Sequence, residues 1–312
     1  MNQLVRARIA SRTVPGTQFL DPTVLTRIGN LELVARYVVE GFIAGAHGSP
    51  FLGLSLDFAG HREYMPGDDI RKIDWKVFGR TDRHYIKEYE AETNANVFFA
   101  IDASRSMDYG SRGITKLDYA RYLTACLAYL SASQRDRVGA AVFDEKLREY
   151  IPPSVRHRRL ILAALDRTVA ETAGDLTRPL IQVAESLARK GIVVLISDLY
   201  AEPQTVLDAA GALRSKGHDV IVFHILDPAE VDFPFDAAQS FEDLETGERL
   251  PVKPHDMRAE YVSLVEGHVG ELAKGMVERG IDHELAVTSV PLDALLFRYL
   301  SYRARRLKGK DR

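Results

Sequence analysis

The chain has 312 residues, of which 46% are hydrophobic and 27% charged, and its formal net charge is −3. This composition excludes an extensively disordered chain, and the near balance of charge argues against a dedicated nucleic-acid-binding protein. The single cysteine, Cys126, excludes an internal disulfide framework and a cysteine-rich zinc site. At about 100–200 residues per domain, the length predicts two domains or one large domain with additions.

Residues 1–20 are basic but lack the apolar segment of a secretory signal. We interpret them as a flexible N-terminus, with a transit peptide as the alternative. No apolar run approaches the ~18 residues that a membrane span needs. We therefore expect a cytoplasmic protein without a membrane span.

A helix is predicted to begin at Asp21 and Pro22, because aspartate caps helix N-termini and proline suits the first helical position. Apolar residues then recur at helical spacing as far as Gly45, which favours a single helix. From residue 49 to 92, short apolar stretches alternate with turn-forming sequences such as Pro66-Gly67. This pattern predicts a small β-rich unit.

Strands and helices alternate from residue 96 onward. We expect strands at 96–101, 138–143, 147–151, 192–196 and 220–225, and helices at 116–133, 156–168, 176–190 and 203–216. The first and fourth of these strands are unbroken apolar runs, which are typical of strands buried on both faces of a parallel sheet. The pattern predicts an α/β fold with a doubly wound, mostly parallel sheet flanked by helices.

The remainder of the chain predicts a hairpin and two long helices. The hairpin is expected at 239–252, and the helices at 257–279 and 292–307. We therefore divide the chain into a flexible N-terminus, a helix with a β-rich unit, the α/β domain, and a C-terminal part that packs on the core. The corresponding boundaries are 1–20, 21–93, 94–230 and 231–312.

Acidic residues follow two of the buried strands. Asp102, Ser104 and Ser106 form a D-x-S-x-S loop after the first, and Asp198 follows the strand at 192–196. Ligands of open α/β sheets bind at the carboxyl ends of the strands, so we expect these side chains to converge. Carboxylates and hydroxyls are hard oxygen ligands of the kind Mg²⁺ prefers. The sequence thus predicts a divalent-cation site, with mere capping of the following turn as the alternative.

Two stretches carry a resemblance to known families. Residues 101–107, IDASRSM, resemble the metal-ion-dependent adhesion site of von Willebrand factor A domains. Residues 62–76, REYMPGDDIRKIDWK, are similar to the signature of the bacterial domain of unknown function 58, and Ser197-Asp198-Leu199 also fits. The resemblance spans roughly residues 30–305. It implies a von Willebrand A-like fold and a MoxR-type AAA+ ATPase as partner, in the assembly or maturation of other proteins.

One position departs from the family pattern. The family usually has a threonine before Asp-Leu in the third metal loop, whereas Gly174 precedes Asp175-Leu176 here. Glycine offers no side-chain oxygen, so Thr172, Asp175 or a water has to replace it. We take Thr172 as a fifth ligand beside Asp102, Ser104, Ser106 and Asp198. The metal is expected to be Mg²⁺ or another divalent cation such as Mn²⁺ or Ca²⁺.

The signature segment has its own candidate residues. Arg71 and Asp74 are suited to a charge network, with Trp75 as its apolar anchor. The favoured interpretation is a structural network that fixes the β-rich unit onto the sheet. The alternative is a partner-binding surface, because tryptophan and arginine are typical interface anchors.

Catalysis is not expected. Haloacid-dehalogenase-like phosphatases also place an aspartate after a buried strand, but they need a second carboxylate two residues later, where this chain has Ser104. Neither a P-loop nor a G-x-S-x-G nucleophile elbow occurs. We therefore expect a metal-dependent protein–protein interaction module. A structural or scaffold protein with a degenerate metal site is the alternative, and a phosphatase-like hydrolase is a more distant one.

Overall fold

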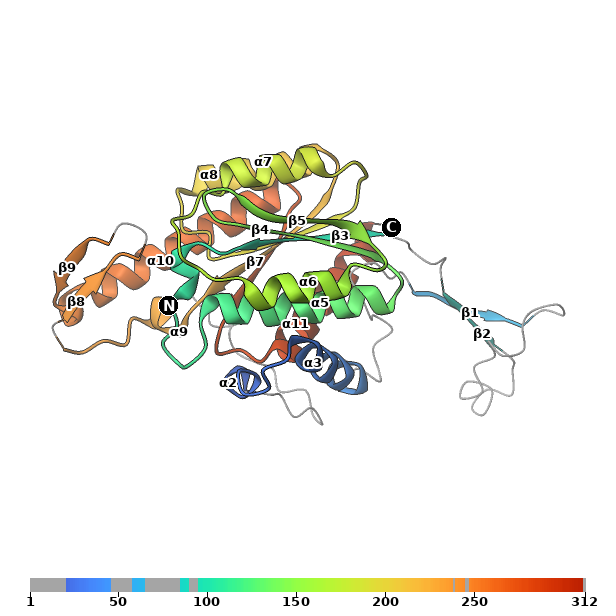
Figure 1. The fold of residues 1–312 in the computed structure, drawn as a ribbon, viewed down its shortest axis with the longest axis horizontal. Coiled ribbons are helices and arrows are strands. Elements are labelled where there is room, and N and C mark those ends of the chain that lie inside the picture. Colours follow the sequence, from blue (N-terminus) through green and yellow to red (C-terminus); the bar gives the residue numbers. More distant parts are fainter. Residues whose placement is uncertain are drawn as a thin grey trace.

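The computed structural model describes residues 21–45, 58–64, 85–89, 95–237, 239–244 and 247–310. A six-stranded sheet forms its centre, in the order β10-β7-β6-β3-β4-β5 (Figure 1). All neighbouring strands are parallel except the β4–β5 pair at one edge, which is antiparallel. The strands are β3 Asn96–Asp102, β4 Arg137–Phe143, β5 Leu147–Ser154, β6 Ile192–Ser197, β7 Asp219–Leu226 and β10 Asp282–Val287.

Helices cover both faces of this sheet (Figure 1). On one face lie α3 Leu31–Gly45, α5 Lys116–Ser133, α6 Arg158–Arg167 and α11 Leu292–Lys310, and on the other α7 Thr177–Ser186, α8 Pro203–Ser215 and α10 Pro254–Glu278. The predicted doubly wound, mostly parallel α/β sheet is confirmed.

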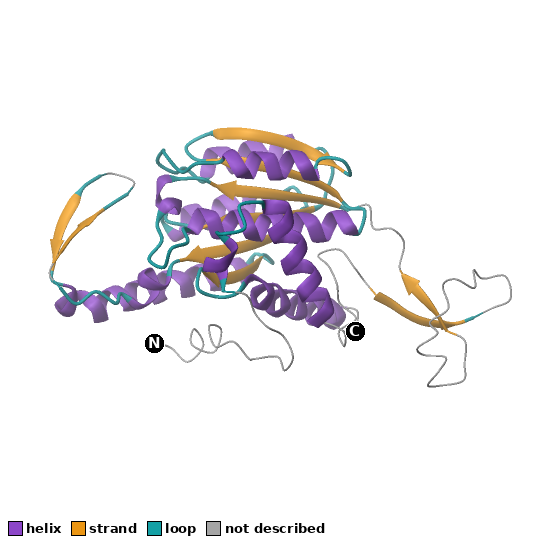
Figure 2. Ribbon diagram, turned by 60° about the horizontal axis from the view of Figure 1, so that its bottom comes forward, coloured by secondary structure: helices purple, strands orange, loops and turns teal. Residues whose placement is uncertain are grey.

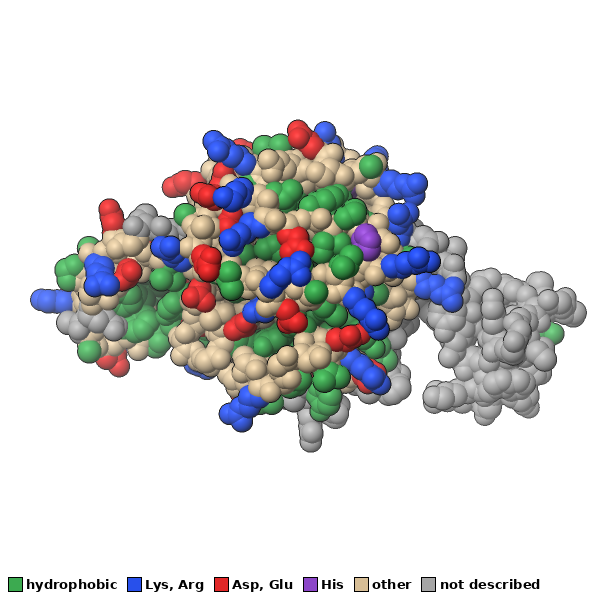
Figure 3. All heavy atoms as spheres, in the orientation of Figure 1, with side chains coloured by type: hydrophobic (Ala, Val, Ile, Leu, Met, Phe, Trp, Pro, Cys, Tyr) green, Lys and Arg blue, Asp and Glu red, His purple; other side chains and the backbone are tan. Residues whose placement is uncertain are grey.

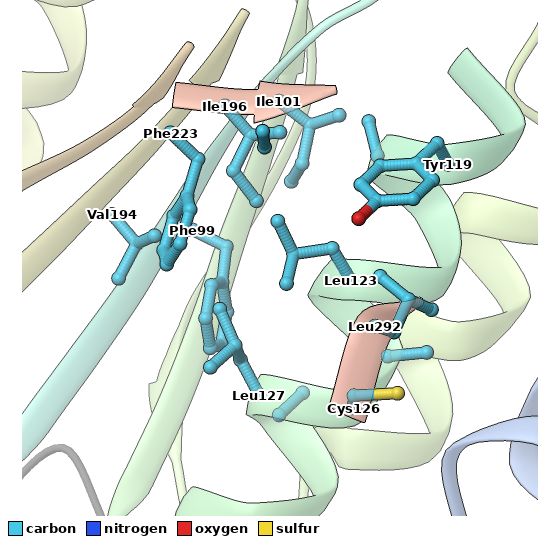
Figure 4. Packing of buried hydrophobic residues seen from close by; sticks show 14 of the residues in the cluster. Phe99, Ile101, Tyr119, Leu123, Cys126, Leu127, Val194, Ile196, Phe223 and Leu292 are labelled. Atoms are coloured by element: carbon cyan, nitrogen blue, oxygen red, sulfur yellow. The ribbon is translucent and has the colours of Figure 1, made fainter. Parts of the chain in front are cut away.

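The sheet has a separate hydrophobic core on each face because successive strand residues point to opposite sides. Phe99 and Ile101 of β3 belong to the core under α5, whereas Phe98 and Ala100 belong to the core under α7 and α8. Figure 4 shows the first core, where Phe99 and its neighbours on β6 and β7 face Leu123 of α5. This burial on both faces explains why β3 is apolar throughout.

The strand order places a topological switch at β3 and β6. The chain leaves β3 toward β4 and β5 on one side and later returns to form β6 on the other side. In doubly wound sheets, ligands bind outside the carboxyl ends of the strands at this switch. The fold therefore predicts a ligand site at the carboxyl ends of β3 and β6.

The N-terminal helix differs from its prediction. Asp21 does cap a helix, by accepting a hydrogen bond from the Thr23 amide at 2.9 Å. However, α2 Pro22–Leu25 ends after one turn and α3 begins at Leu31. Gly29 adopts φ +60° between them, and the Asn30 side chain accepts the Leu33 amide at 3.1 Å. A left-handed glycine and a new cap thus divide the expected single helix in two.

A short helix and a sheet strand are among the elements that were not predicted. The short helix α9 Pro228–Asp232 follows β7, and β10 adds a sixth strand after α10. The polar start of β10 conceals the strand in the sequence, because arginines from α11 bind Asp282 and Glu284 there. Since β10 pairs with β7, the sheet extends past the boundary expected at residue 230.

Two antiparallel hairpins lie at opposite ends of the molecule (Figures 1 and 2). One pairs β1 Phe58–Glu63 with β2 Tyr85–Tyr89, in the region expected to be β-rich. The other pairs β8 Gln239–Glu242 with β9 Arg249–Val252, as predicted. Arg71, Asp74 and Trp75 lie outside the described residues, so their interpretation stays a prediction.

The surface carries both signs of charge. On the face seen in Figure 3, lysine and arginine alternate with aspartate and glutamate, and neither sign forms a continuous field. No helix among the described residues is long and apolar enough to cross a lipid bilayer.

Candidate functional site

The D-x-S-x-S loop begins at the carboxyl end of β3. Asp102 is the last residue of the strand and is 4% exposed. Its Oδ1 accepts the Ser104 amide at 2.8 Å, and its Oδ2 accepts the Ser197 hydroxyl at 2.6 Å. These bonds tie the loop after β3 to the end of β6, and they fix the carboxylate at the switch point.

The two serine hydroxyls of the loop lie side by side. Ser104 Oγ and Ser106 Oγ are 3.1 Å apart, and both residues are buried. Ligands at ~2.0–2.1 Å in an octahedral shell are separated by roughly 3 Å along an edge. The spacing of the two hydroxyls therefore suits two adjacent ligands of Mg²⁺.

Asp198 directly follows β6, and the structure brings it next to Asp102. However, the Asp198 carboxylate already forms an ion pair with a lysine. Lys116 Nζ lies 2.8 Å from Asp198 Oδ2 and 2.6 Å from Glu230 Oε1. Lys116 is the first residue of α5 and is 1% exposed. Lysine is rarely buried unless paired, and no sequence pattern indicated this contact.

The charges of the site are unbalanced. Burial and the nearby Asp198 carboxylate raise the pKa of Asp102 to about 7, although hydrogen bonds from Ser197 and Ser104 act in the opposite direction. Burial acts to lower the pKa of Lys116, but Asp198 and Glu230 outweigh it and raise that pKa. Among the described residues, no cation forms an ion pair with Asp102. A further positive charge would thus stabilise the ionised site.

Thr172 lies beside Ser104, where a short parallel bridge joins their backbones. The Thr172 carbonyl accepts the Arg105 amide at 2.7 Å, and its hydroxyl donates to the buried Asp144 carboxylate. A hydroxyl that donates its proton keeps its lone pairs. Thr172 as a metal ligand therefore stays a prediction.

Gly174 approaches the loop closely. A Cβ atom at this position would lie 2.8 Å from Ser104 Cβ and 3.4 Å from Ser104 Oγ. A threonine, which the family pattern usually has here, would force this loop to move. The glycine therefore fits the way in which this chain packs the two loops together.

The donor set fits a hard divalent cation. Asp102, Ser104 and Ser106 supply one carboxylate and two hydroxyls, and Asp198 supplies a second carboxylate that Lys116 shares. The described part of the chain holds no group of three or more histidine, cysteine, aspartate or glutamate side chains placed to bind a metal. Oxygen donors of this kind suit Mg²⁺, Mn²⁺ or Ca²⁺ better than a soft transition metal.

A cavity of about 410 Å³ borders the site at Asp198. Its wall is mostly apolar and includes part of α10. The residues that line it include Tyr200, His224, Glu230, Leu264 and Val265. A side chain from outside thus has room beside Asp198.

The comparison with protein families identifies the chain. The model of the family described as "Protein of unknown function DUF58" matches residues 60–270. The chain belongs to this family. The resemblance inferred from residues 62–76 is therefore confirmed, whereas the association with a MoxR-type ATPase stays a prediction.

Relatives and solved structures extend this comparison. The uncharacterized protein Rv1480 of Mycobacterium tuberculosis is 25% identical over 261 residues, which are 81% of each chain, and Mb1516 of Mycobacterium bovis has the same values. The conserved hypothetical protein BatB of Bacteroides thetaiotaomicron is similar at 18% identity, with a TM-score of 0.48 over 68% of this chain and 99% of that chain. The SpRpn10 VWA domain is similar at 10% identity, with a TM-score of 0.40 over 65% of this chain and 94% of that chain.

Proposed function

We propose that this chain is a protein-interaction module whose contact runs through a divalent cation. Asp102, Ser104 and Ser106 would hold the cation directly, and Asp198 would do so directly or through water. The observation that carries the proposal is the buried Asp102 carboxylate, which lies beside Asp198 and has no cationic partner among the described residues. Burying a carboxylate without a compensating charge is costly, so this arrangement favours a bound cation.

The geometry also supports binding of a partner. The bound cation would supply an open coordination position for a carboxylate oxygen of the partner protein. The cavity beside Asp198 offers space for an adjacent apolar side chain. The chain itself places no proton-transferring group two residues after Asp102, where Ser104 stands, and this favours binding over catalysis.

The partner class rests on the family resemblance. DUF58 membership supports a MoxR-type AAA+ ATPase, or a client of such an ATPase, as the protein that contacts the site. In this proposal the chain works in the cytoplasm, in the assembly or maturation of other proteins.

Metal binding is tested by titration calorimetry of the purified chain with MnCl₂. We expect one site in the wild type and no binding in Asp102→Ala. The matched control is Asp208→Ala, which removes a carboxylate that is 66% exposed on α8 and should leave binding unchanged. A wild type that binds no Mn²⁺, Mg²⁺ or Ca²⁺ would contradict the metal-dependent part of the proposal.

The partner is tested by affinity capture with the purified MoxR-type ATPase. Retention in Mg²⁺ and release in EDTA are expected for the wild type, with no retention by Asp102→Ala. Equal retention in both buffers would place the interaction surface elsewhere, and the segment of Trp75 would be examined next.

A further inference from the structure

Lys116 joins three parts of the fold at the carboxyl edge of the sheet. It begins α5, and its ammonium bonds Asp198 after β6 and Glu230 in α9. Glu230 is fixed in turn, because its Oε2 accepts the Asp227 amide at 2.8 Å within a capping box. The ammonium therefore has one acceptor that belongs to the candidate metal site and one that does not.

The charge balance gives this contact a consequence for metal binding. The ammonium pairs with two carboxylates, those of Asp198 and Glu230, and the Asp102 carboxylate lies beside Asp198 without a cation. Two negative charges remain when all groups are ionised, which is the charge that a divalent cation neutralises. An ammonium and a metal ion compete for the same carboxylate oxygens, since both bind through charge.

We propose that Lys116 is a built-in competitor of the metal, which holds Asp198 and so limits the affinity of the site for divalent cations. This inference rests on the proposed function. Lys116 is a positioning residue here, since it acts on the metal through Asp198. The fixed Glu230 carboxylate gives the ammonium a second place when Asp198 turns to the metal, so binding does not require an unpaired buried lysine.

The direct test is the Mn²⁺ affinity of Lys116→Met, measured by titration calorimetry. Removing the ammonium frees Asp198, and we expect binding at least about tenfold tighter, within the range known for changes around metal ligands. The matched control is Arg112→Met, which removes the same charge from an exposed position in the loop before α5. Arg112→Met should bind Mn²⁺ as the wild type does, because solvent screens exposed charges.

A second variant distinguishes the loss of the Lys116–Asp198 ion pair from a change in net charge, and it also avoids leaving Glu230 without a cation. Lys116→Met alone leaves the half-buried Glu230 carboxylate without its cation, so the double variant Lys116→Met/Glu230→Gln removes that carboxylate as well. The double variant has the formal charge of the wild type, yet Asp198 is free. We expect it to bind Mn²⁺ more tightly than the wild type. Equal affinity in a folded double variant would overturn the inference.

The contribution of Asp198 gives an independent readout. Asp198→Asn should weaken Mn²⁺ binding only slightly in the wild type, where Lys116 holds the carboxylate, and strongly in the double variant. Additive effects would contradict the competition, because residues that do not interact change the free energy independently.

The outcomes distinguish this inference from the proposed function. If the wild type binds Mn²⁺ and the lysine variants bind equally well, the inference fails and the proposed function stands. If only the lysine variants bind, the inference holds and metal-dependent function of the wild type fails. Absence of binding in every protein would overturn both.

Discussion

The two edges of the central sheet each contain buried charges, but they balance them differently. At the amino edge, Arg303 bonds Asp282 at the start of β10 and Asp219 at the start of β7. Each carboxylate has its own guanidinium nitrogen, and Asp219 is also 43% exposed to water. At the carboxyl edge, Lys116 is shared by two carboxylates, and Asp102 lies beside them without a cation of its own.

This difference separates a network whose charges are paired within the fold from a cluster that, under the proposed function, leaves a place for a cation. The amino-edge network ties α11 to two strands and pairs each carboxylate with the Arg303 guanidinium. When all its groups are ionised, the carboxyl-edge cluster keeps an excess of negative charge in a buried place. This charge destabilises the folded protein unless Asp102 is protonated or a cation binds. The same kinds of side chain thus form a charge-balanced network at one edge and an unbalanced cluster at the other.

Breaking the amino edge should have the largest effect on stability. Arg303→Met leaves Asp282, which is 5% exposed, without its cation. We expect the free energy of unfolding to fall by about 3–5 kcal/mol, as for other buried pairs that lose one partner. Urea denaturation measures the loss, and Mn²⁺ affinity should not change because the site lies at the other edge. Arg249→Met, whose side chain is 72% exposed, is the control and should cost at most about 1 kcal/mol.

A small loss in Arg303→Met would show that water already screens the amino edge. In that case solvent, and not Arg303, would balance the buried charge of Asp282, and the two edges would not differ in how their carboxylates are neutralised.

Replacing Gly174 by the threonine that the family pattern usually has tests how closely the two loops pack at the carboxyl edge. Gly174→Thr places a Cβ 2.8 Å from Ser104 Cβ, so one of the two loops has to move. We expect a loss of about 1–3 kcal/mol in unfolding free energy, as for other overpacked sites, together with weaker Mn²⁺ binding. Gly174→Ala isolates the steric part, because it adds the Cβ without a hydroxyl. Stronger metal binding by Gly174→Thr than by Gly174→Ala would mean that the loops can rearrange around a threonine ligand.

The pH dependence of the metal-free protein tests the charge imbalance itself. In the folded protein the pKa of Asp102 is raised from 3.8 to about 7. The contribution of Asp102 to the free energy of unfolding is therefore fully present below pH 3.8 and is lost as the pH rises through 7. In EDTA, we expect Asp102→Asn to be more stable than the wild type at pH 8 by about 1–3 kcal/mol, and the gain to shrink toward pH 5. Guanidinium denaturation at both pH values measures this, and an equal gain at both would exclude titration of Asp102 as the cause.

Much of this architecture could be predicted from the sequence because burial leaves a clear pattern. The β3 and β6 strands are apolar throughout since both faces pack on helices, and α5 was predicted with its observed bounds of Lys116–Ser133. The convergence of Asp102 with Asp198 followed from the shared carboxyl edge of parallel strands. Local sequence was sufficient for these elements because their buried residues are mostly apolar.

The remainder depends on contacts between distant residues. Lys116 meets Asp198 and Glu230 across 82 and 114 positions, and a lysine that begins a helix gives no local sign of burial. The polar first half of β10 is compatible with a strand only because α11 pairs its charges. Both features belong to the charge networks at the sheet edges, which no local pattern encodes.

The smallest expected effect concerns Thr172, the remaining candidate ligand at the carboxyl edge. Thr172→Val removes the hydroxyl that donates to Asp144, but that carboxylate keeps the Lys146 amide at 3.1 Å and Arg148 at 3.2 Å. We therefore expect a loss of only about 1 kcal/mol in unfolding free energy. Mn²⁺ affinity should fall about tenfold if the oxygen is a ligand, in line with the effect of altered metal surroundings. A loss of stability with unchanged affinity would assign Thr172 to the support of the loop alone, and the protein would then offer the cation only the oxygens of the β3 loop and Asp198.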